Sequence, residues 1–423
     1  MYATDFPWMI LGGKCVKIVE GGVNAPKGFL ATGRHIGIKK VKKDISLLYS
    51  QTDAVAAGVF TQNTVKAAPV IRNEALIRQK QTIRGIVTVS GVANACTGQQ
   101  GLEDNAAMAR EYAKALGVEE REILTAATGV IGVLLPMEVI LSGIRDTAPY
   151  LSSSAEEAKN AGFGIFTTDT FLKEIAVELT IAGSKVRIGA MAKGSGMVHP
   201  NMATVLAFIT TDIVISQELL QKALQKAVAD TYNMISVDGC VSTNDMALIL
   251  ANGQANNPPF EEESIFFEQF CEALLFINRK LAMDVVHDGE GAGKFMEIQV
   301  EGARDVSAAR RLAKAVATDN LVKTALYGED ANWGRVLAAM GGCQAPFSPD
   351  GVELYFQSEK GTVKLMELGR PIWFDENQAA DILKERDIVI KILLRDGTGS
   401  ATAWGCDLGH EYVRINGEYR SRT

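Results

Sequence analysis

Hydrophobic and polar positions along the chain follow two periods that are mixed from one end to the other. Short segments rich in β-branched residues, or alternating between apolar and polar positions, predict strands. Segments with apolar residues every three or four positions predict helices, and Gly117 and Ser216 supply a C-terminal and an N-terminal cap. The predicted strands are 28–40, 53–63, 84–91, 205–209 and 294–303, and the predicted helices are 104–116, 217–233, 261–283, 307–318 and 334–342. This mixture predicts sheets covered by helices, in layers.

The C-terminal pattern is more specific. Residues 387–408, "DIVIKILLRDGTGSATAWGCDL", contain two strand-like runs around Asp396-Gly397. An Asp-Gly pair between such runs is a strong signal for a tight turn. We therefore expect a β-hairpin here.

Composition narrows the class of protein. The chain has 423 residues, enough for two or three cores, and its net charge of −7 argues against a nucleic-acid partner. The basic run Lys39–Lys43 is therefore interpreted as a solvated loop or edge strand. No apolar run approaches the roughly 20 residues of a membrane span, and no targeting segment is recognisable, so we expect a cytoplasmic protein without a membrane partner. Six widely spaced cysteines predict reduced thiols.

Familiar catalytic signatures are missing from the sequence. The four histidines form no metal-binding pair, so no metal site is expected, and there is no GxSxG elbow. The segment "GEGAGKF" fails as a phosphate loop at two positions. Threonine remains as a candidate. In "TAATGVIG", predicted as a loop, the Thr128 hydroxyl and the Gly129 amide could point at one oxygen, although a simple helix-capping turn explains the same residues.

The segment "AKGSGMVHPNMATVLAFITTD" passes from a glycine-rich turn directly into an apolar strand at Ala203-Thr204. A strained turn would let the Thr204 hydroxyl attack the carbonyl of Ala203, and hydrolysis of the resulting ester would cut the chain. The new N-terminal residue would carry its own nucleophile and a base, because an α-amine has a pKa of about 7.7–8.0. A threonine that merely opens a buried strand remains the alternative on spacing alone.

This segment closely resembles the self-cleaving region of the ornithine acetyltransferase family, the glutamate N-acetyltransferases of arginine biosynthesis. The blocks "GGVNAPKGFLATG", "ANACTG", "TAATGVIG", "SVDGCVSTND", "DGEGAGKF", "YGEDANWGRVLAA" and "EYVRINGEYRS" also resemble family blocks, in family order and over nearly the whole chain. The resemblance implies a layered α/β sandwich of the self-processing, N-terminal-nucleophile kind, with a smaller C-terminal region.

The resemblance also implies a mechanism. Cleavage between Ala203 and Thr204 would give an α chain of residues 1–203 and a β chain of 204–423, assembled as α₂β₂. Thr204 would carry acetyl from N-acetylornithine to glutamate. The implied oxyanion hole is Thr128 and Gly129, and the implied substrate-binding residues are Thr167, Lys193, Thr204, Glu290, Asn416 and Ser421. No cofactor is implied, and whether acetyl-CoA is a second acetyl donor is left open.

Four positions depart from the family pattern: Val92, Cys240, Gly293 and Ser421. They leave the fine shape of the substrate pocket open. The alternative function is an N-terminal-nucleophile amidase or peptidase, in which water replaces glutamate as the acceptor.

Overall fold

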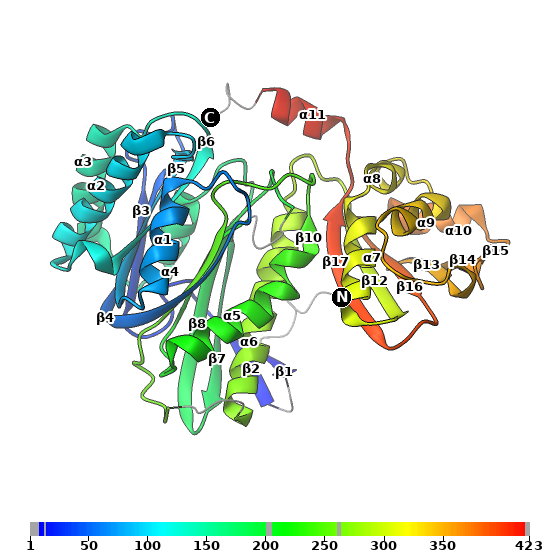
Figure 1. Ribbon diagram of the computed structural model, residues 1–423, viewed down its shortest axis with the longest axis horizontal. Coiled ribbons are helices and arrows are strands. Elements are labelled where there is room, and N and C mark those ends of the chain that lie inside the picture. The colour runs from blue at the N-terminus through cyan, green and yellow to red at the C-terminus, as the bar shows by residue number, and fades with distance from the viewer. Residues whose placement is uncertain (1–7, 12–13, 200–204, 260–263, 419–423) are drawn as a thin grey trace.

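The computed structural model describes residues 8–11, 14–199, 205–259 and 264–418. These residues form a large body and a smaller one, each built on its own sheet (Figure 1). In the large body the described strands are β1 (Trp8–Leu11), β2 (Lys14–Val19), β3 (Phe29–Arg34), β4 (Ile45–Phe60), β5 (Ile83–Val92), β6 (Ile123–Val130), β7 (Lys173–Ile181), β8 (Ser184–Lys193), β9 (Leu206–Thr211) and β11 (Met246–Ala251).

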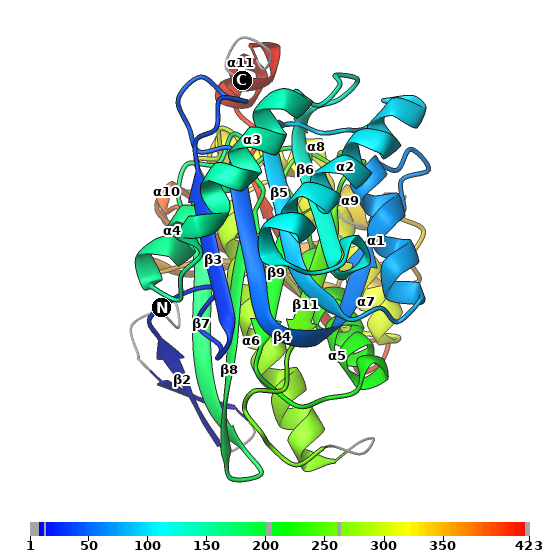
Figure 2. The ribbon, with the colours of Figure 1, turned by 90° about the vertical axis from the view of Figure 1, so that its left-hand side faces the viewer.

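The long strand β4 joins two layers of this sheet. The strand order is β1-β2-β7-β8-β9-β11-β4-β5-β6, and β3 pairs with β4 beside β5. The first part of β4 pairs with β3 and β5, whereas Val55–Phe60 pairs with β11. The two layers therefore stack face to face, as Figure 2 shows. One apolar core lies between them and includes Leu48 and Ile86 from one layer and Phe208 and Leu248 from the other.

Helices cover both outer faces of this pair of layers (Figure 2). Because side chains alternate along a strand, Leu48 faces the inner core while Leu47 faces α2 and α3. On the opposite face α5 and α6 pack over β4, β7 and β8. The helices of the large body are α1 (Ala68–Arg78), α2 (Gly98–Leu116), α3 (Met137–Thr147), α4 (Ala155–Gly164), α5 (Gln217–Ala229) and α6 (Ile265–His287). The result is a four-layer α/β sandwich, which confirms the predicted fold class.

The smaller body holds the C-terminal part of the chain (Figure 1). Its strands are β10 (Ile235–Ser236), β12 (Phe295–Ala303), β13 (Glu353–Ser358), β14 (Gly361–Glu367), β15 (Arg370–Pro371), β16 (Asp387–Leu393) and β17 (Gly399–Cys406). Its helices are α7 (Val306–Thr318), α8 (Asn320–Tyr327), α9 (Trp333–Gly342) and α10 (Glu376–Lys384). A final helix, α11 (His410–Gly417), runs from this body towards the large one.

The hairpin predicted for residues 387–408 is wrong. Both strands form and Asp396-Gly397 lies between them, but β12 separates β16 from β17 in the sheet. The backbone N–H groups of Asp396 and Gly397 donate to the carbonyl of Gly302, at the end of β12. The turn therefore carries the chain across the end of β12, because the apolar strand β12 occupies the place between its two arms.

Most other elements agree with the hydrophobic pattern. Ser216 caps α5 by accepting a hydrogen bond from the Leu219 N–H, and Gly117 ends α2 in the left-handed region at φ +71°. The segment "TAATGVIG", predicted as a loop, is instead largely strand β6, paired in parallel with β5. The prediction that residues 39–43 are simply solvated fails for Lys39, which is buried and donates to the Phe166 carbonyl.

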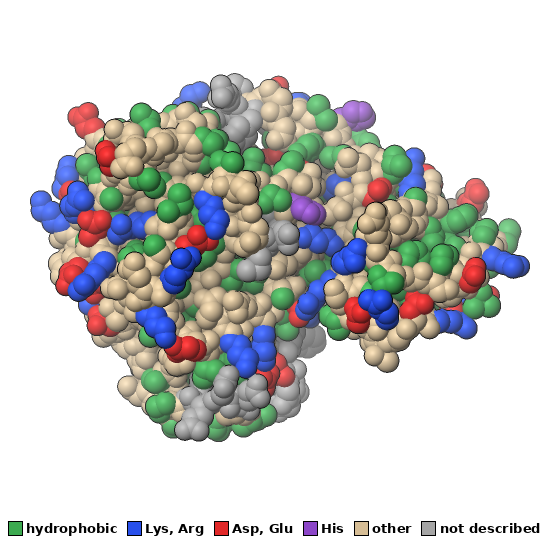
Figure 3. All heavy atoms as spheres, in the orientation of Figure 1, with side chains coloured by type: hydrophobic (Ala, Val, Ile, Leu, Met, Phe, Trp, Pro, Cys, Tyr) green, Lys and Arg blue, Asp and Glu red, His purple; other side chains and the backbone are tan. Residues whose placement is uncertain are grey.

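The surface and the helices carry little further information on partners. On the face shown in Figure 3, basic and acidic side chains are interspersed, so that no side of this view has a single sign of charge. None of the helices in the described ranges is both long and apolar enough to cross a membrane.

Candidate active site

One pocket of about 310 Å³ gathers most of the predicted site residues. It lies where the carboxyl ends of β6 and β8 and the start of β9 meet the loop before β11, the loop after α6 and helix α11. Its walls are Thr128, Gly129, Val130, Ile131, Thr167, Thr168, Lys193, Gly196, Met197, Val205, Leu206, Ser242, Thr243, Asn244, Asp245, Glu290 and Asn416. Both halves of the sequence therefore build the site.

Thr128 and Gly129 lie at the end of β6, where its pairing with β5 shifts register. Gly129 has φ +135°, which side chains rarely tolerate, and a Cβ there would lie 2.2 Å from the Gly91 carbonyl carbon. Glycine is thus required for the close approach of two backbones. This irregular strand end places Thr128 and Gly129 in the pocket wall. A hydroxyl and a backbone amide are the kinds of donor that an oxyanion site requires.

Lys193 supplies a positive charge on the neighbouring wall. It ends β8 and is almost fully buried, with its Nζ 2.8 Å from the Thr167 Oγ1 and 3.5 Å from the Thr128 Oγ1. The ammonium therefore connects the predicted oxyanion residue with a predicted substrate-binding threonine. A cation so placed can attract a carboxylate.

Glu290 and Asn416 approach the pocket from the C-terminal half. The Glu290 backbone N–H donates to the Ser195 carbonyl at 2.9 Å, and the Asn416 Nδ2 donates to the Glu290 Oε2 at 2.8 Å. The carboxyl group packs directly on Gly196, where a Cβ would lie 2.3 Å from the Glu290 Cδ. The Glu290 carboxyl group is thereby held in place, where it can bind an ammonium group.

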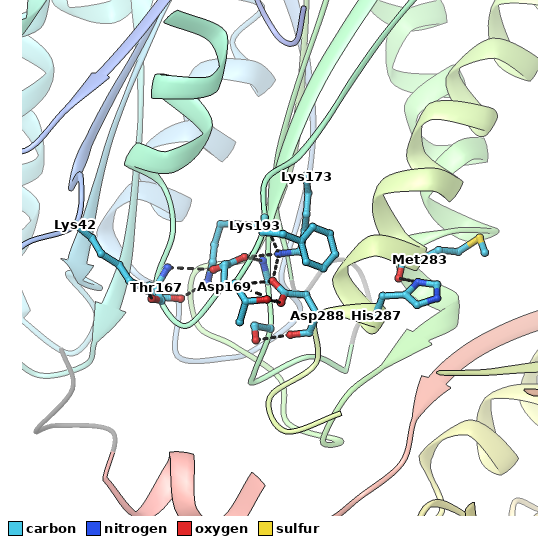
Figure 4. A network of polar contacts seen from close by, with 12 residues as sticks. Lys42, Thr167, Asp169, Lys173, Lys193, Met283, His287 and Asp288 are labelled. Carbon is cyan, nitrogen blue, oxygen red and sulfur yellow. Dashed lines mark hydrogen bonds and ion pairs between the residues drawn. The ribbon is translucent and has the colours of Figure 1, made fainter. Parts of the chain in front are cut away.

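A buried ion network lies behind Thr167 and Lys193 (Figure 4). The Lys173 Nζ lies 2.8 Å from the Asp169 Oδ1 and 2.5 Å from the Asp288 Oδ2, and all three side chains are essentially inaccessible. Asp169 also accepts hydrogen bonds from the backbone N–H groups of Thr167 and Gly194. The network therefore ties the Thr167 loop, the end of β8 and the end of α6 to one another.

The charge state of Asp169 follows from these contacts. Burial alone would raise its pKa, but attraction to Lys173 and Lys193 and the hydrogen bonds to it outweigh burial and lower that pKa. Asp169 is thus a carboxylate at neutral pH, balancing the lysines beside it.

Asp238 organises the turn that precedes residue 200. Its carboxylate accepts hydrogen bonds from the backbone N–H groups of Met197 and Val198 and from the Tyr412 hydroxyl of α11. Met197 has φ +54°, in the left-handed region. The turn thus approaches residue 200 under backbone constraint.

The structure brings Thr128, Gly129, Thr167, Lys193, Glu290 and Asn416 together in one pocket, and their roles stay predictions. Ala203, Thr204 and Ser421 lie outside the described residues, so their roles stay predictions. Of the four departures, Ser421 also lies outside that part of the chain. Val92 lies opposite Thr128 in the β5–β6 ladder, so this departure touches the oxyanion strand, whereas Gly293 and Cys240 are not among the residues that line the pocket.

Sequence reasoning missed several residues of the site. The Asn244 Nδ2 donates to the carbonyls of Ala93 and Ala127, which fixes the loop before β11 against β6. Asp245 beside it lines the pocket. Both belong to the block "SVDGCVSTND", but their chemistry depends on strands that are distant in the sequence. Asp169 and Lys173 could not be identified from the sequence for the same reason. Their partner Asp288 comes close to them only in the folded chain.

The fold and the pocket together define an acyl-transfer enzyme. A four-layer α/β sandwich places a hydroxyl and a backbone amide beside one buried cation and one buried anion. That combination can stabilise an oxyanion and bind an amino acid at the same point.

Comparison with known proteins gives the particular family. Residues 30–421 match the ArgJ family. The chain is 48% identical over 406 residues to the arginine biosynthesis bifunctional protein ArgJ of Caldanaerobacter subterraneus subsp. tengcongensis, covering 96% of this chain and 100% of the relative. It is 48% identical over 397 residues to the Thermotoga neapolitana protein of the same name, covering 94% of this chain and 99% of the relative.

Among solved structures, ornithine acetyltransferase from Mycobacterium tuberculosis complexed with ornithine matches 44% of this chain and 100% of its own, with 34% identity and a TM-score of 0.42. The sequence matches show that the chain belongs to the ArgJ family, and it is an acyltransferase of arginine biosynthesis.

Proposed function

We propose that the chain is a glutamate N-acetyltransferase that moves acetyl from N-acetylornithine to glutamate through an ester on Thr204. The observation that carries this proposal is a single pocket that combines Thr128 and Gly129, the charged pair Lys193 and Glu290, and the start of β9. Val205 and Leu206 line the pocket, so the residue that precedes them in the chain is its natural nucleophile.

Self-cleavage prepares the nucleophile. The Thr204 hydroxyl attacks the Ala203 carbonyl carbon, the peptide nitrogen leaves as the α-amine of Thr204, and water then opens the ester. The products are residues 1–203 and 204–423. The constrained turn held by Asp238 supports a strained peptide at this point.

Transfer then takes two steps. The α-amine of Thr204 accepts the hydroxyl proton as the oxygen attacks the acetyl carbonyl, and this proton goes to the departing ornithine nitrogen. Glutamate's free amine attacks the acetyl ester, the C–O bond breaks, and the Thr204 oxygen regains a proton. Thr128 and Gly129 donate hydrogen bonds to the oxyanion in both steps. One difficult amide transfer thus becomes two easier ones.

Both substrates are amino acids, and the pocket offers a partner for each charge. Lys193 can pair with a carboxylate, and Glu290, held by Asn416, can pair with an ammonium. The proposal also includes Ser421 among the substrate-binding residues. Relatives that share 48% identity are named bifunctional, which supports acetyl-CoA as a second acetyl donor. An α₂β₂ assembly and a cytoplasmic location complete the proposal, supported by the family's biosynthetic role.

A denaturing gel and a transfer assay test this function. The wild-type chain should separate into two bands near half of 45.5 kDa, and Thr204→Ala should leave one band and no transfer. Acetylornithine with glutamate should give ornithine and N-acetylglutamate in equal amounts. Acetate release that is indifferent to glutamate would identify the amidase instead, and an uncut, active wild-type chain would overturn the nucleophile.

A further inference from the structure

Asp245 is an acidic residue of the pocket that the mechanism above leaves without a task. It lies immediately before β11, and backbone hydrogen bonds fix both Asp245 and the residue that follows it. The Thr61 N–H donates to the Asp245 carbonyl at 3.0 Å, and the Met246 N–H donates to the Val205 carbonyl at 3.1 Å. Asp245 therefore immediately precedes the residue that bonds to Val205, the first described residue after Thr204.

The carboxyl group of Asp245 has an unused acceptor. The residue is only 5% exposed, and its Oδ2 is buried without a hydrogen-bond partner among the described residues. Leaving such a buried atom unpaired destabilises the folded protein. Since the same side chain lines the substrate pocket, a bound molecule with a donor can satisfy this oxygen.

The groups around Asp245 determine its charge. Burial raises its pKa well above the ordinary value, while hydrogen bonding from Ser242 and attraction to Lys193 lower it by less. Lys193 approaches from β8, Ser242 belongs to the same loop, and Glu290 lines the same pocket from the loop after α6. Burial therefore favours the uncharged acid form of Asp245.

We propose that Asp245 contacts the substrate and accepts, at Oδ2, a hydrogen bond from the nitrogen that gives up or receives the acetyl group. This inference rests on the proposed function. The acetamido nitrogen of N-acetylornithine carries one N–H, and the free amine of glutamate carries two N–H groups and a lone pair. One N–H directed at Asp245 leaves that lone pair to face the acetyl carbon.

The absence of charge on Asp245 matters for this role. An ionised carboxylate would hold the incoming amine as an ammonium ion, which has no lone pair and cannot attack. A neutral carboxyl with its proton on Oδ1 accepts the hydrogen bond at Oδ2 and leaves the amine free. Asp245 exchanges no proton in this scheme, because the proton lost by the amine goes to the Thr204 oxygen as the ester bond breaks.

Two substitutions separate this role from simple packing. Asp245→Asn keeps the shape and an uncharged acceptor oxygen, so it should retain at least a third of kcat at pH 7. Asp245→Ala removes the acceptor and should lower kcat by about tenfold to a hundredfold. The pH profile adds an independent readout. Wild-type kcat should decline as rising pH ionises Asp245, and this alkaline decline should be missing in Asp245→Asn.

Asp212→Asn is the matched control. Asp212 is also a buried acid with a raised pKa, but it follows the opposite end of β9 and accepts hydrogen bonds from the backbone N–H groups of Lys27 and Arg187. Its replacement should leave kcat within about twofold of wild type, with the alkaline decline intact.

The outcomes distinguish the two proposals. A wild-type chain that fails to cut itself or to transfer acetyl overturns the proposed function. With an active wild type, wild-type kcat in Asp245→Ala, or a persistent alkaline decline in Asp245→Asn, overturns the role of Asp245 alone. Should Asp245→Ala not fold, the pH profile of Asp245→Asn decides by itself.

Discussion

At the end of β6 a single glycine determines how closely two strands approach. Gly129 combines φ +135° with a backbone contact that leaves no room for a methyl group. The neighbouring Thr128 depends on that strand end for its position, which places its Oγ1 3.5 Å from the Lys193 Nζ. The residue types were legible in the sequence, since a hydroxyl beside a glycine suggests an oxyanion site. The strand geometry could not be predicted from the sequence, because it arises from pairing with Gly91, 38 positions earlier.

Gly129→Ala should reduce acetyl transfer by at least a hundredfold, because the methyl group must displace the Gly91 backbone and with it the oxyanion donors. Gly132→Ala is the control. Gly132 has φ +80°, but nothing lies within 4 Å of the added carbon. It should lower the free energy of unfolding by about 1–2 kcal/mol and keep most of the activity. Steady-state kinetics and urea unfolding of both variants provide the comparison, and equal activity losses would contradict the steric argument.

Among the elements, Lys173 at the start of β7 connects the loop after α4 with the end of helix α6. Its ammonium lies between Asp169 and Asp288. Because all three side chains are buried, solvent does not screen their charges. Removing the lysine would leave two buried carboxylates facing each other. The elements themselves could be predicted from local periodicity, as Ser216 and Gly117 show. Their partners could not, since β12 lies between β16 and β17 although the local pattern indicated a hairpin.

Lys173→Met should lower the free energy of unfolding by about 3–5 kcal/mol, the usual effect of breaking a buried ion pair. Lys280→Met is the control, because the Lys280–Asp284 pair is partly exposed and should contribute less than about 1 kcal/mol. Denaturant titration at pH 7 measures both. If both substitutions lowered the free energy of unfolding by similarly small amounts, the network would not stabilise the fold.

The same network predicts how stability depends on pH. The folded-state pKa of Asp169 lies below its unfolded value of about 3.9, so its contribution is fully present above that pH and is lost as the pH falls below it. Wild-type protein should therefore lose stability steeply between about pH 4 and pH 2. Lys173→Met should show a shallower loss over this window, because Asp169 no longer has its main partner.

At the scale of the whole molecule, α11 runs from the smaller body towards the large one (Figure 1). Its residue Asn416 lines the pocket. None of its residues is buried, yet Asn416 binds Glu290 and the Tyr412 hydroxyl binds Asp238. The helix thus contributes to the site and little to the core. The sequence resemblance implies that Asn416 is a binding residue, and the fold adds that its side chain donates a hydrogen bond to Glu290.

A chain that ends at Gly409 should therefore fold but bind substrate poorly. We expect its melting temperature to fall by no more than a few degrees, since no apolar core is lost. The KM for glutamate should rise by about tenfold or more, because Glu290 loses its hydrogen-bond donor. Asn416→Ala, which keeps the helix, should reproduce much of the change in KM. Calorimetry and kinetics measure the two effects, and a large drop in melting temperature would show that α11 stabilises the fold.

Strands β9 and β11 lie side by side in the middle of their layer, flanked by β8 on one side and β4 on the other. A break before β9 would therefore produce two polypeptides that are interleaved within one hydrogen-bonded sheet. They could part only by global unfolding, and recovery from denaturant would become a second-order reaction that slows on dilution. The intact Thr204→Ala chain would refold at a rate independent of concentration. Self-cleavage would therefore give two chains that cannot separate while folded, and whose refolding depends on the protein concentration.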